Sequence, residues 1–190
     1  EPAPDQGDAL LHEIVTAADY RMRRGQYKTD PDLQRLHALV PWIVVWDDHE
    51  SANDAWSGGA ENHDPATEGD WAARKAASVR AYYEWMPVRR EGDRLYRRLR
   101  FGDLAELSML DLRTYRSEQA RPVDGKTVDE PGRTITGKEQ MAWLTAGLAS
   151  SPTRWQLVGN SVMFAPLLLP PLDVRTTGAL TALLGAPSSG

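Results

Sequence analysis

Residues 41–50, PWIVVWDDHE, decide the fold, because an apolar run ends there abruptly in three acidic residues and a histidine. A run rich in β-branched and aromatic residues that opens with proline is typical of a strand buried on both faces. In open α/β sheets, ligands bind at the carboxyl ends of strands. The sequence therefore predicts a strand over residues 41–46 and a functional site in residues 47–50.

A solvated turn is the plain alternative for these charged residues. Asp47 and Asp48 are adjacent, and neighbouring carboxylates repel each other unless a cation or an arginine offsets their charge. This repulsion favours a functional site over a turn.

The composition is that of a folded, soluble protein. The 190 residues suffice for one domain with a substantial core, and 26% of them are charged and 41% hydrophobic. The net charge of -5 predicts no nucleic-acid-binding module, and no apolar run is long enough to span a bilayer. Because cysteine is absent, disulfides, zinc-thiolate sites and cysteine nucleophiles are excluded.

Hydrophobic periodicity and turn residues outline the rest of the chain. Four helices are predicted: residues 12–24, 30–40 and 67–86, and a segment that follows a capping box at 136–139. Gly25 is expected to end the first of them, and Asp30 is expected to cap the second, with Pro31 in its first turn. A β-hairpin is predicted over 95–101 and 104–110, and one more strand over 155–159.

Several charged or polar side chains on these elements have an ordinary structural explanation. His12 and His37 are lone histidines on helices, where such residues are more often structural than ligands. Arg74 and Arg80 are expected on a solvated helix face, and the pair at 97–98 on a solvated strand.

The polar segment at 51–67 is long for a loop inside a compact domain, and loops of this length are usually functional or disordered. Function is favoured by its glycine pair at 58–59, by its many oxygen donors, and by Trp56, which is costly to leave exposed. A plain surface loop is the alternative.

Three predicted strand ends carry polar side chains, at residues 47–49, at Asp111 with Arg113, and at Asn160. Carboxylate and amide oxygens suit hard metal ions, and arginine suits bidentate binding of phosphate or carboxylate. This combination favours metal-assisted chemistry on an anionic ester, with His49 as a proton donor to the leaving group. A serine hydrolase is disfavoured because no Gly-x-Ser-x-Gly elbow occurs.

Six segments together resemble the middle of the catalytic domain of PhoD-like alkaline phosphatases, in the metallophosphoesterase superfamily. They are WDDHESAND at 46–54, YYEWMPVR at 82–89, FGDL at 101–104, LDLRTYR at 110–116, GKEQMAWL at 137–144 and VGNSVMF at 158–164. They occur in the family's order.

The resemblance implies an α/β fold in which two β-sheets form a sandwich flanked by helices, incomplete in this chain. It implies exported enzymes, periplasmic or secreted, that hydrolyse phosphate monoesters and often diesters with calcium and ferric iron as cofactors. Carried over residue by residue, it makes Asp48 and Asp47 metal ligands and His49 the catalytic contact to phosphate. The implied substrate-binding residues are Asn53, Arg113 and Asn160.

The family also needs a Gly-Asp-x-Ile-Tyr-like strand before these motifs and a Gly-Asp-x-His-like strand after them, and neither occurs here. We therefore expect residues 1–165 to form a partial PhoD-like domain followed by a weakly patterned tail at 166–190, with little or no activity alone. One alternative is a noncatalytic remnant that binds a metal or an anion and assembles with a partner chain. Another is a related hydrolase of a different anionic ester.

Overall fold

The computed structural model describes residues 12–89, 92, 94–120 and 129–163. The chain divides into two compact units, residues 1–119 with 132–161, and residues 120–131 with 162–190. Every helix and strand described below belongs to the first unit. No helix in the described part of the chain is long and apolar enough to cross a membrane. The tail predicted at 166–190 lies outside the described residues.

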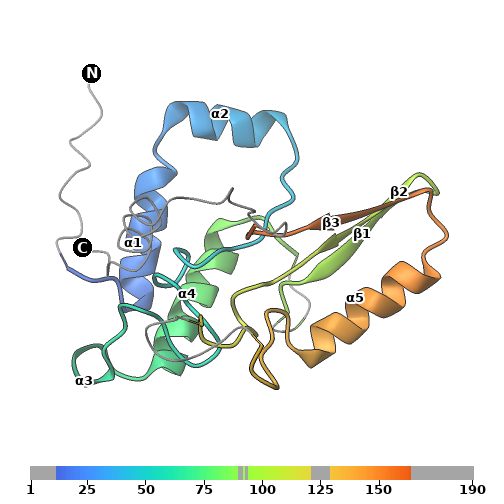
Figure 1. Ribbon diagram of the computed structural model, residues 1–190. Coiled ribbons are helices and arrows are strands. Elements are labelled where there is room, and N and C mark those ends of the chain that lie inside the picture. Colours follow the sequence, from blue (N-terminus) through green and yellow to red (C-terminus); the bar gives the residue numbers. More distant parts are fainter. Residues whose placement is uncertain (1–11, 90–91, 93, 121–128, 164–190) are drawn as a thin grey trace, which may run out of the picture. The chain divides into compact units, whose positions relative to one another are not determined.

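The first unit is a mixed α/β structure (Figure 1). Its helices are α1 (Ala17–Tyr27), α2 (Pro31–Leu39), α3 (Pro65–Glu68), α4 (Trp71–Trp85) and α5 (Lys138–Ser150). Its strands are β1 (Arg97–Phe101), β2 (Ala105–Met109) and β3 (Trp155–Gly159). The described residues thus contain one sheet, and the predicted sandwich of two sheets is not seen among them.

The sheet has the order β1-β2-β3. β1 and β2 form the predicted hairpin, with Arg97 opposite Met109, and its turn places Gly102 at φ 57°, a conformation that suits glycine. β3 is confirmed as a strand and pairs parallel to β2, so α5 forms the crossover between them. Arg98 holds α5 against the sheet and is not solvated as expected: its guanidinium donates to the Trp143 carbonyl at 3.0 Å and lies over the Trp143 ring.

Short polar side chains begin most of the helices. Thr16 and Asp19 form a capping box at α1, and Asp30 caps α2 with a proline in its first turn, as predicted. The helix predicted over 67–86 is instead divided, because Gly69 adopts φ 79° and Asp70 caps a new helix, α4. The capping box predicted at 136–139 is absent: Gly137 begins α5 without a side-chain cap.

The first helix begins later than predicted and continues through Gly25. α1 packs beside α4 (Figure 1), and a Cβ atom on Gly25 would lie 3.3 Å from the Trp85 ring. Glycine therefore allows the two helices to approach closely at this point and does not end α1.

The strand predicted over residues 41–46 is not formed. This segment has no regular secondary structure, Ile43 is 41% exposed, and of its residues only Trp46 is buried. A strand needs a neighbour to pair with, and no described strand lies in register with this segment. Trp46 instead packs with Tyr82 and Leu95 in the main core cluster, and this contact fixes where the acidic residues begin.

Candidate functional site

The chain turns tightly around the Asp48 side chain, directly after the buried Trp46. Asp48 is 6% exposed, and its two carboxylate oxygens accept backbone hydrogen bonds from His49 at 3.0 Å and Asp54 at 2.9 Å. Its carbonyl oxygen accepts two more from Ser51 and Ala52. Asp48 therefore organises the start of the 51–67 loop as well as carrying a charge.

Arg113 supplies the positive charge that the adjacent aspartates require. Its Nε donates to Oδ1 of Asp47 at 2.6 Å, and its two Nη atoms lie 3.6 Å from Asp48 Oδ2 and 3.7 Å from Asp54 Oδ1. The Arg113 side chain is 12% exposed, so these attractions are only partly screened by water. The structure thus brings together three of the predicted site residues, Asp47, Asp48 and Arg113.

The surroundings of Asp48 favour its charged form. Burial alone would raise the pKa of Asp48, but the hydrogen bond from the Asp54 backbone and the charge of Arg113 outweigh it. The net effect lowers the pKa of Asp48 below its ordinary value, with smaller contributions from His49. The group is therefore an anion near neutral pH.

Asp111 and Gln140 position the backbone of Arg113 through hydrogen bonds. Asp111 is fully buried, and its Oδ1 accepts the backbone N–H groups of Arg113 and Thr114. Gln140 on α5 accepts from the Asp111 N–H and donates to the carbonyls of Asp111 and Thr136, each at 2.8 Å. The sequence did not assign this role to Gln140, because its partner Asp111 lies 29 residues away.

His49 faces away from this buried cluster. Its side chain is 80% exposed, and its Nδ1 lies 3.6 Å from Asp48 Oδ1. His49 and Asn53 line an open cleft of about 400 Å³, which is also lined by residues of α1 and the segment before it. Asn53 also donates to Glu61 at 2.5 Å across the loop. An exposed imidazole beside a carboxylate is suited to proton transfer.

The loop at 51–67 is closed on itself and tied to the Arg113 segment. Trp56 donates to the Gly59 carbonyl at 2.8 Å, and a Cβ atom on Gly58 would lie 2.5 Å from the Trp56 ring. The next residue, Ser57, donates to the Arg116 carbonyl at 3.1 Å. The glycine pair therefore makes room for the tryptophan, which packs and is not left exposed.

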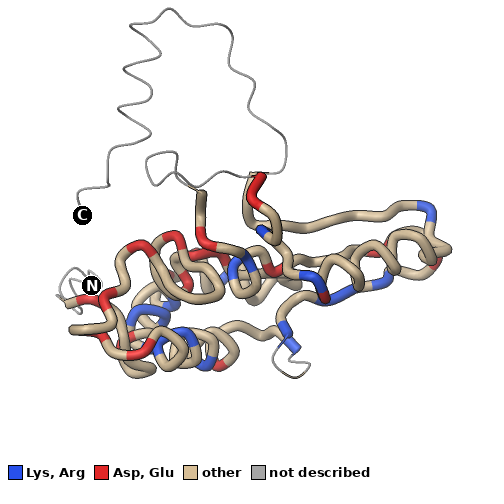
Figure 2. Tube along the Cα trace, turned by 60° about the horizontal axis from the view of Figure 1, so that its bottom comes forward, with Lys and Arg blue, Asp and Glu red and all other residues tan. Residues whose placement is uncertain are grey.

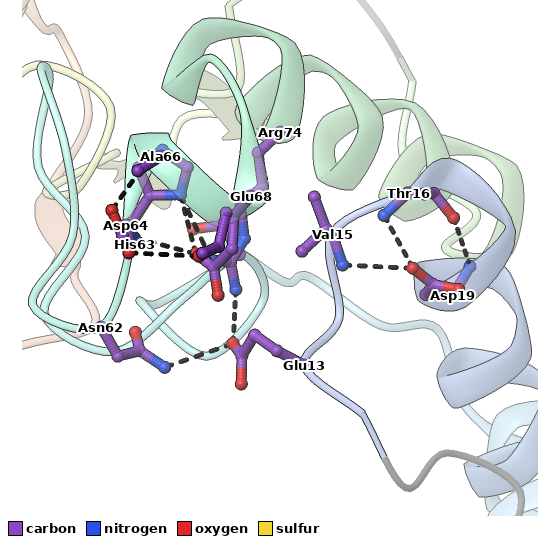
Figure 3. A network of polar contacts seen from close by, with 12 residues as sticks. Glu13, Val15, Thr16, Asp19, Asn62, His63, Asp64, Ala66, Glu68 and Arg74 are labelled. Carbon is purple, nitrogen blue, oxygen red and sulfur yellow. Dashed lines mark hydrogen bonds and ion pairs between the residues drawn. The ribbon is translucent and has the colours of Figure 1, made fainter.

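The prediction that Arg74 lies on a solvated helix face is wrong, because Arg74 is buried. Its side chain is 1% exposed, and its guanidinium contacts Glu13 at 2.5 Å and Glu68 at 2.7 Å (Figure 3). It also donates to the Tyr20 hydroxyl. His63, which is also buried, lies 3.1 Å from the same Glu68. This network joins the segment before α1, the end of the 51–67 loop, α3 and α4. Arg80, in contrast, is exposed as expected.

Asn160 follows β3 at the same end of the sheet as Leu110 follows β2, since the Leu110 N–H donates to the Gly159 carbonyl at 2.9 Å. It is exposed, and it is not among the residues that line the cleft. The structure therefore places Asn160 near the Asp111 strand end but not in the group around Arg113.

The described residues do not form a metal centre by themselves. Nowhere among them do three His, Cys, Asp or Glu side chains gather as one ion would require. Asp47 and Asp48 already face Arg113, and a calcium ion takes about six to eight oxygen ligands. Any metal at this position would need ligands from other residues.

Comparisons with known proteins agree on one family. The model of the PhoD-like phosphatase family matches residues 3–181. Alkaline phosphatase D of Bacillus subtilis (strain 168) is 38% identical over an alignment of 163 residues, and the alignment covers 80% of this chain and 28% of that protein. A solved structure of PhoD superposes with a TM-score of 0.71 at 37% identity and covers 81% of this chain and 31% of its own. The chain spans less than a third of the length of these relatives, and it belongs to the PhoD-like phosphatase family.

Proposed function

We propose that this chain contributes the site at residues 47–54, with Arg113, to a phosphatase that hydrolyses phosphate monoesters, and diesters as well. The observation that carries this proposal is the position of His49, exposed on an open cleft and 3.6 Å from the buried Asp48 carboxylate. In this role His49 donates a proton to the leaving-group oxygen, and the neighbouring Asp48 carboxylate orients the imidazole. Family membership supports phosphate-ester chemistry in general.

We further propose calcium and ferric iron as cofactors, with Asp48 and Asp47 as two of the ligands. This part of the proposal rests on the family resemblance, because the described residues alone do not complete such a site. When bound, the metals would supply a water molecule of lowered pKa as the nucleophile. Arg113, Asn53 and Asn160 are proposed as substrate-binding residues, and an exported location, periplasmic or secreted, follows from the same resemblance.

The test compares phosphate release from 4-nitrophenyl phosphate with and without added calcium. Asp48→Ala and His49→Ala are expected to lower kcat at least about 100-fold, the range that general acid catalysis supplies. His37→Ala is the matched control, because His37 stacks on Trp42 outside the cleft. Turnover that both site variants leave unchanged would falsify the assignment.

These residues are proposed to form one wall of a larger site. Two observations support this: the described residues supply too few ligands for a metal ion, and the chain covers less than a third of the length of its relatives. We expect a longer protein that contains this chain to exceed the 190 residues alone in activity. Equal activity of the longer protein and the 190 residues alone would contradict the larger site. The assignment of Asp48 and His49 would still be tested by the variants above.

A second candidate is a noncatalytic chain that binds a metal or an anion and assembles with a partner. It is favoured by the outer strand β3, where Trp155 is 59% exposed, Leu157 47% and Val158 44%, since exposed apolar strands at a sheet edge promote association. Calcium binding by calorimetry, together with a dimer in light scattering and no phosphate release, would select this candidate.

A further inference from the structure

The cleft that exposes His49 has a second wall, formed by one face of α1. Four residues at three- and four-residue steps share this face: Tyr20, Arg23, Arg24 and Tyr27. Such spacing normally carries an apolar stripe that packs against a core. Here it carries two arginines, and they line the same cleft as His49 and Asn53.

These arginines have few partners of their own. Arg23 donates to Gln26 on the same helix at 2.9 Å. Arg24 is half-buried over the Tyr82 ring, its Nε has no hydrogen-bond partner, and no described carboxylate forms an ion pair with it. Burial lowers the pKa of Arg24, although Glu50 attracts its charge, so an anion placed beside it would stabilise the charged guanidinium.

The two carboxylates of the cleft are engaged elsewhere. Glu13 pairs with Arg74 at 2.5 Å and accepts from Asn62, and Glu50 accepts the Asp47 backbone N–H at 2.6 Å (Figure 3 shows the Glu13 contacts). Elsewhere along the described chain, basic and acidic residues are interspersed (Figure 2). Two arginines without carboxylate partners in one cleft are therefore a local feature, not part of a broad basic surface.

We propose that the α1 face of this cleft is a binding subsite for a second negatively charged group on the phosphate-ester substrate, recognised by Arg23 and Arg24. The preferred substrates are then phosphate esters whose organic part carries a carboxylate or another phosphate. Guanidinium groups match the planar and tetrahedral oxygens of these anions. A cleft of about 400 Å³ also has the size of a small-molecule site. The subsite rests on the proposed phosphatase function.

The test uses two matched substrates, phenyl phosphate and 4-carboxyphenyl phosphate, which differ in one carboxylate. The measured quantity is the ratio of kcat/KM for the charged substrate to that for the plain one. In Arg23→Gln/Arg24→Gln this ratio is expected to fall about tenfold, mainly through KM, as expected for loss of a charged hydrogen bond. Arg35→Gln on α2 is the control for each single substitution, because it removes one positive charge from an exposed residue that does not line the cleft.

Arg24→Lys is expected to retain part of the preference for the charged substrate. Lysine keeps the positive charge and loses only the paired hydrogen bonds of the planar guanidinium. If the double variant does not fold, Arg23→Gln alone carries the test, since the hydrogen bond that Arg23 makes to Gln26 lies within α1. A ratio that the double variant leaves unchanged overturns the subsite, and so does an equal fall in Arg35→Gln.

A binding measurement distinguishes failure of the proposed phosphatase activity from failure of the subsite. If the protein cleaves neither substrate, binding of phenylphosphonate and 4-carboxyphenylphosphonate is measured by titration calorimetry. Tighter binding of the carboxylated ligand, lost in the double variant, supports the subsite although the proposed phosphatase activity has failed. Equal binding of the two ligands overturns the subsite.

Discussion

Arg113 donates from Nε to the Asp47 carboxylate at 2.6 Å, although 66 residues separate the two positions in the sequence. This contact joins the segment after β2 to the acidic turn after Trp46. The same guanidinium lies within 3.7 Å of Asp48 and Asp54, so one cation compensates three carboxylates. Removing it should affect the turn as a whole and not one pair alone.

We predict that Arg113→Gln lowers the free energy of unfolding by about 1–3 kcal/mol, because Asp48 keeps a buried charge without its counter-ion. Urea denaturation followed by circular dichroism measures the change. Asp47 is 40% exposed, so its own share is screened, and the coupling between Asp47→Asn and Arg113→Gln should be about 1 kcal/mol. The coupling is measured with the two single variants and the double variant. If their changes in unfolding free energy are strictly additive, Asp47 and Arg113 are not energetically coupled.

Arg74→Met should destabilise the protein more strongly, by about 3–5 kcal/mol, because it leaves the largely buried Glu68 carboxylate without its cationic partner and removes the pair with Glu13. Arg80→Met is the matched control on the same helix. Arg80 is 69% exposed, and the loss there should stay within about 0.5 kcal/mol. Similar midpoints of urea unfolding for the two variants would contradict the role of the buried network.

The contrast between Arg74 and Arg80 explains which features the sequence predicts. Both lie on one helix with similar local surroundings, and the partners that bury Arg74 include Glu13, 61 residues away. Local signals act over a few residues, so the Asp30 cap and the hairpin turn at Gly102 were predicted correctly. The strand at 41–46 failed for the same reason as Arg74, because strand formation depends on a distant neighbour.

In the candidate site, too, the sequence predicted some residues correctly and missed others whose partners are distant in the chain. The motif at 47–50 and the arginine at 113 were predicted from residue chemistry and resemblance, and their contact confirms that they lie together. The role of Gln140 was not predicted, because its partner Asp111 is 29 residues away. The α1 arginines were not predicted, because helical spacing alone does not show which residues of a helix line a cleft.

The buried Gln140 offers a third prediction. Gln140→Leu retains most of the side-chain volume but removes three hydrogen bonds, and it leaves the Asp111 backbone groups unsatisfied. We expect a loss of about 1–3 kcal/mol in unfolding free energy. We also expect faster amide hydrogen exchange at Arg113 and Thr114, whose N–H groups bond to Asp111. Met141→Leu, at the exposed neighbouring position on α5, is the control. Unchanged exchange at Arg113 would show that α5 does not hold this segment.

Acid should weaken the contact between α1 and α4 through Glu84. Hydrogen bonding from Arg21 at 2.5 Å, and then from Arg80, lowers the pKa of Glu84 to about 2 from an ordinary 4.5. Because the folded-state pKa is the lower one, the stabilisation is complete above pH 4.5 and is lost as pH falls from about 4.5 to about 2. In Glu84→Gln the unfolding free energy should therefore fall less steeply over this range than in the parent.

Thermal unfolding midpoints measured from pH 6 to pH 2 test this prediction, with Glu139→Gln as the control. Glu139 is exposed on α5 and forms no ion pair with α1, so its variant should keep the parent's slope. Both Arg21 and Glu84 are 37% exposed, which means that salt should reduce the difference between parent and Glu84→Gln. Parallel pH curves for these two proteins at low salt would show that the Arg21–Glu84 pair does not link the helices in solution.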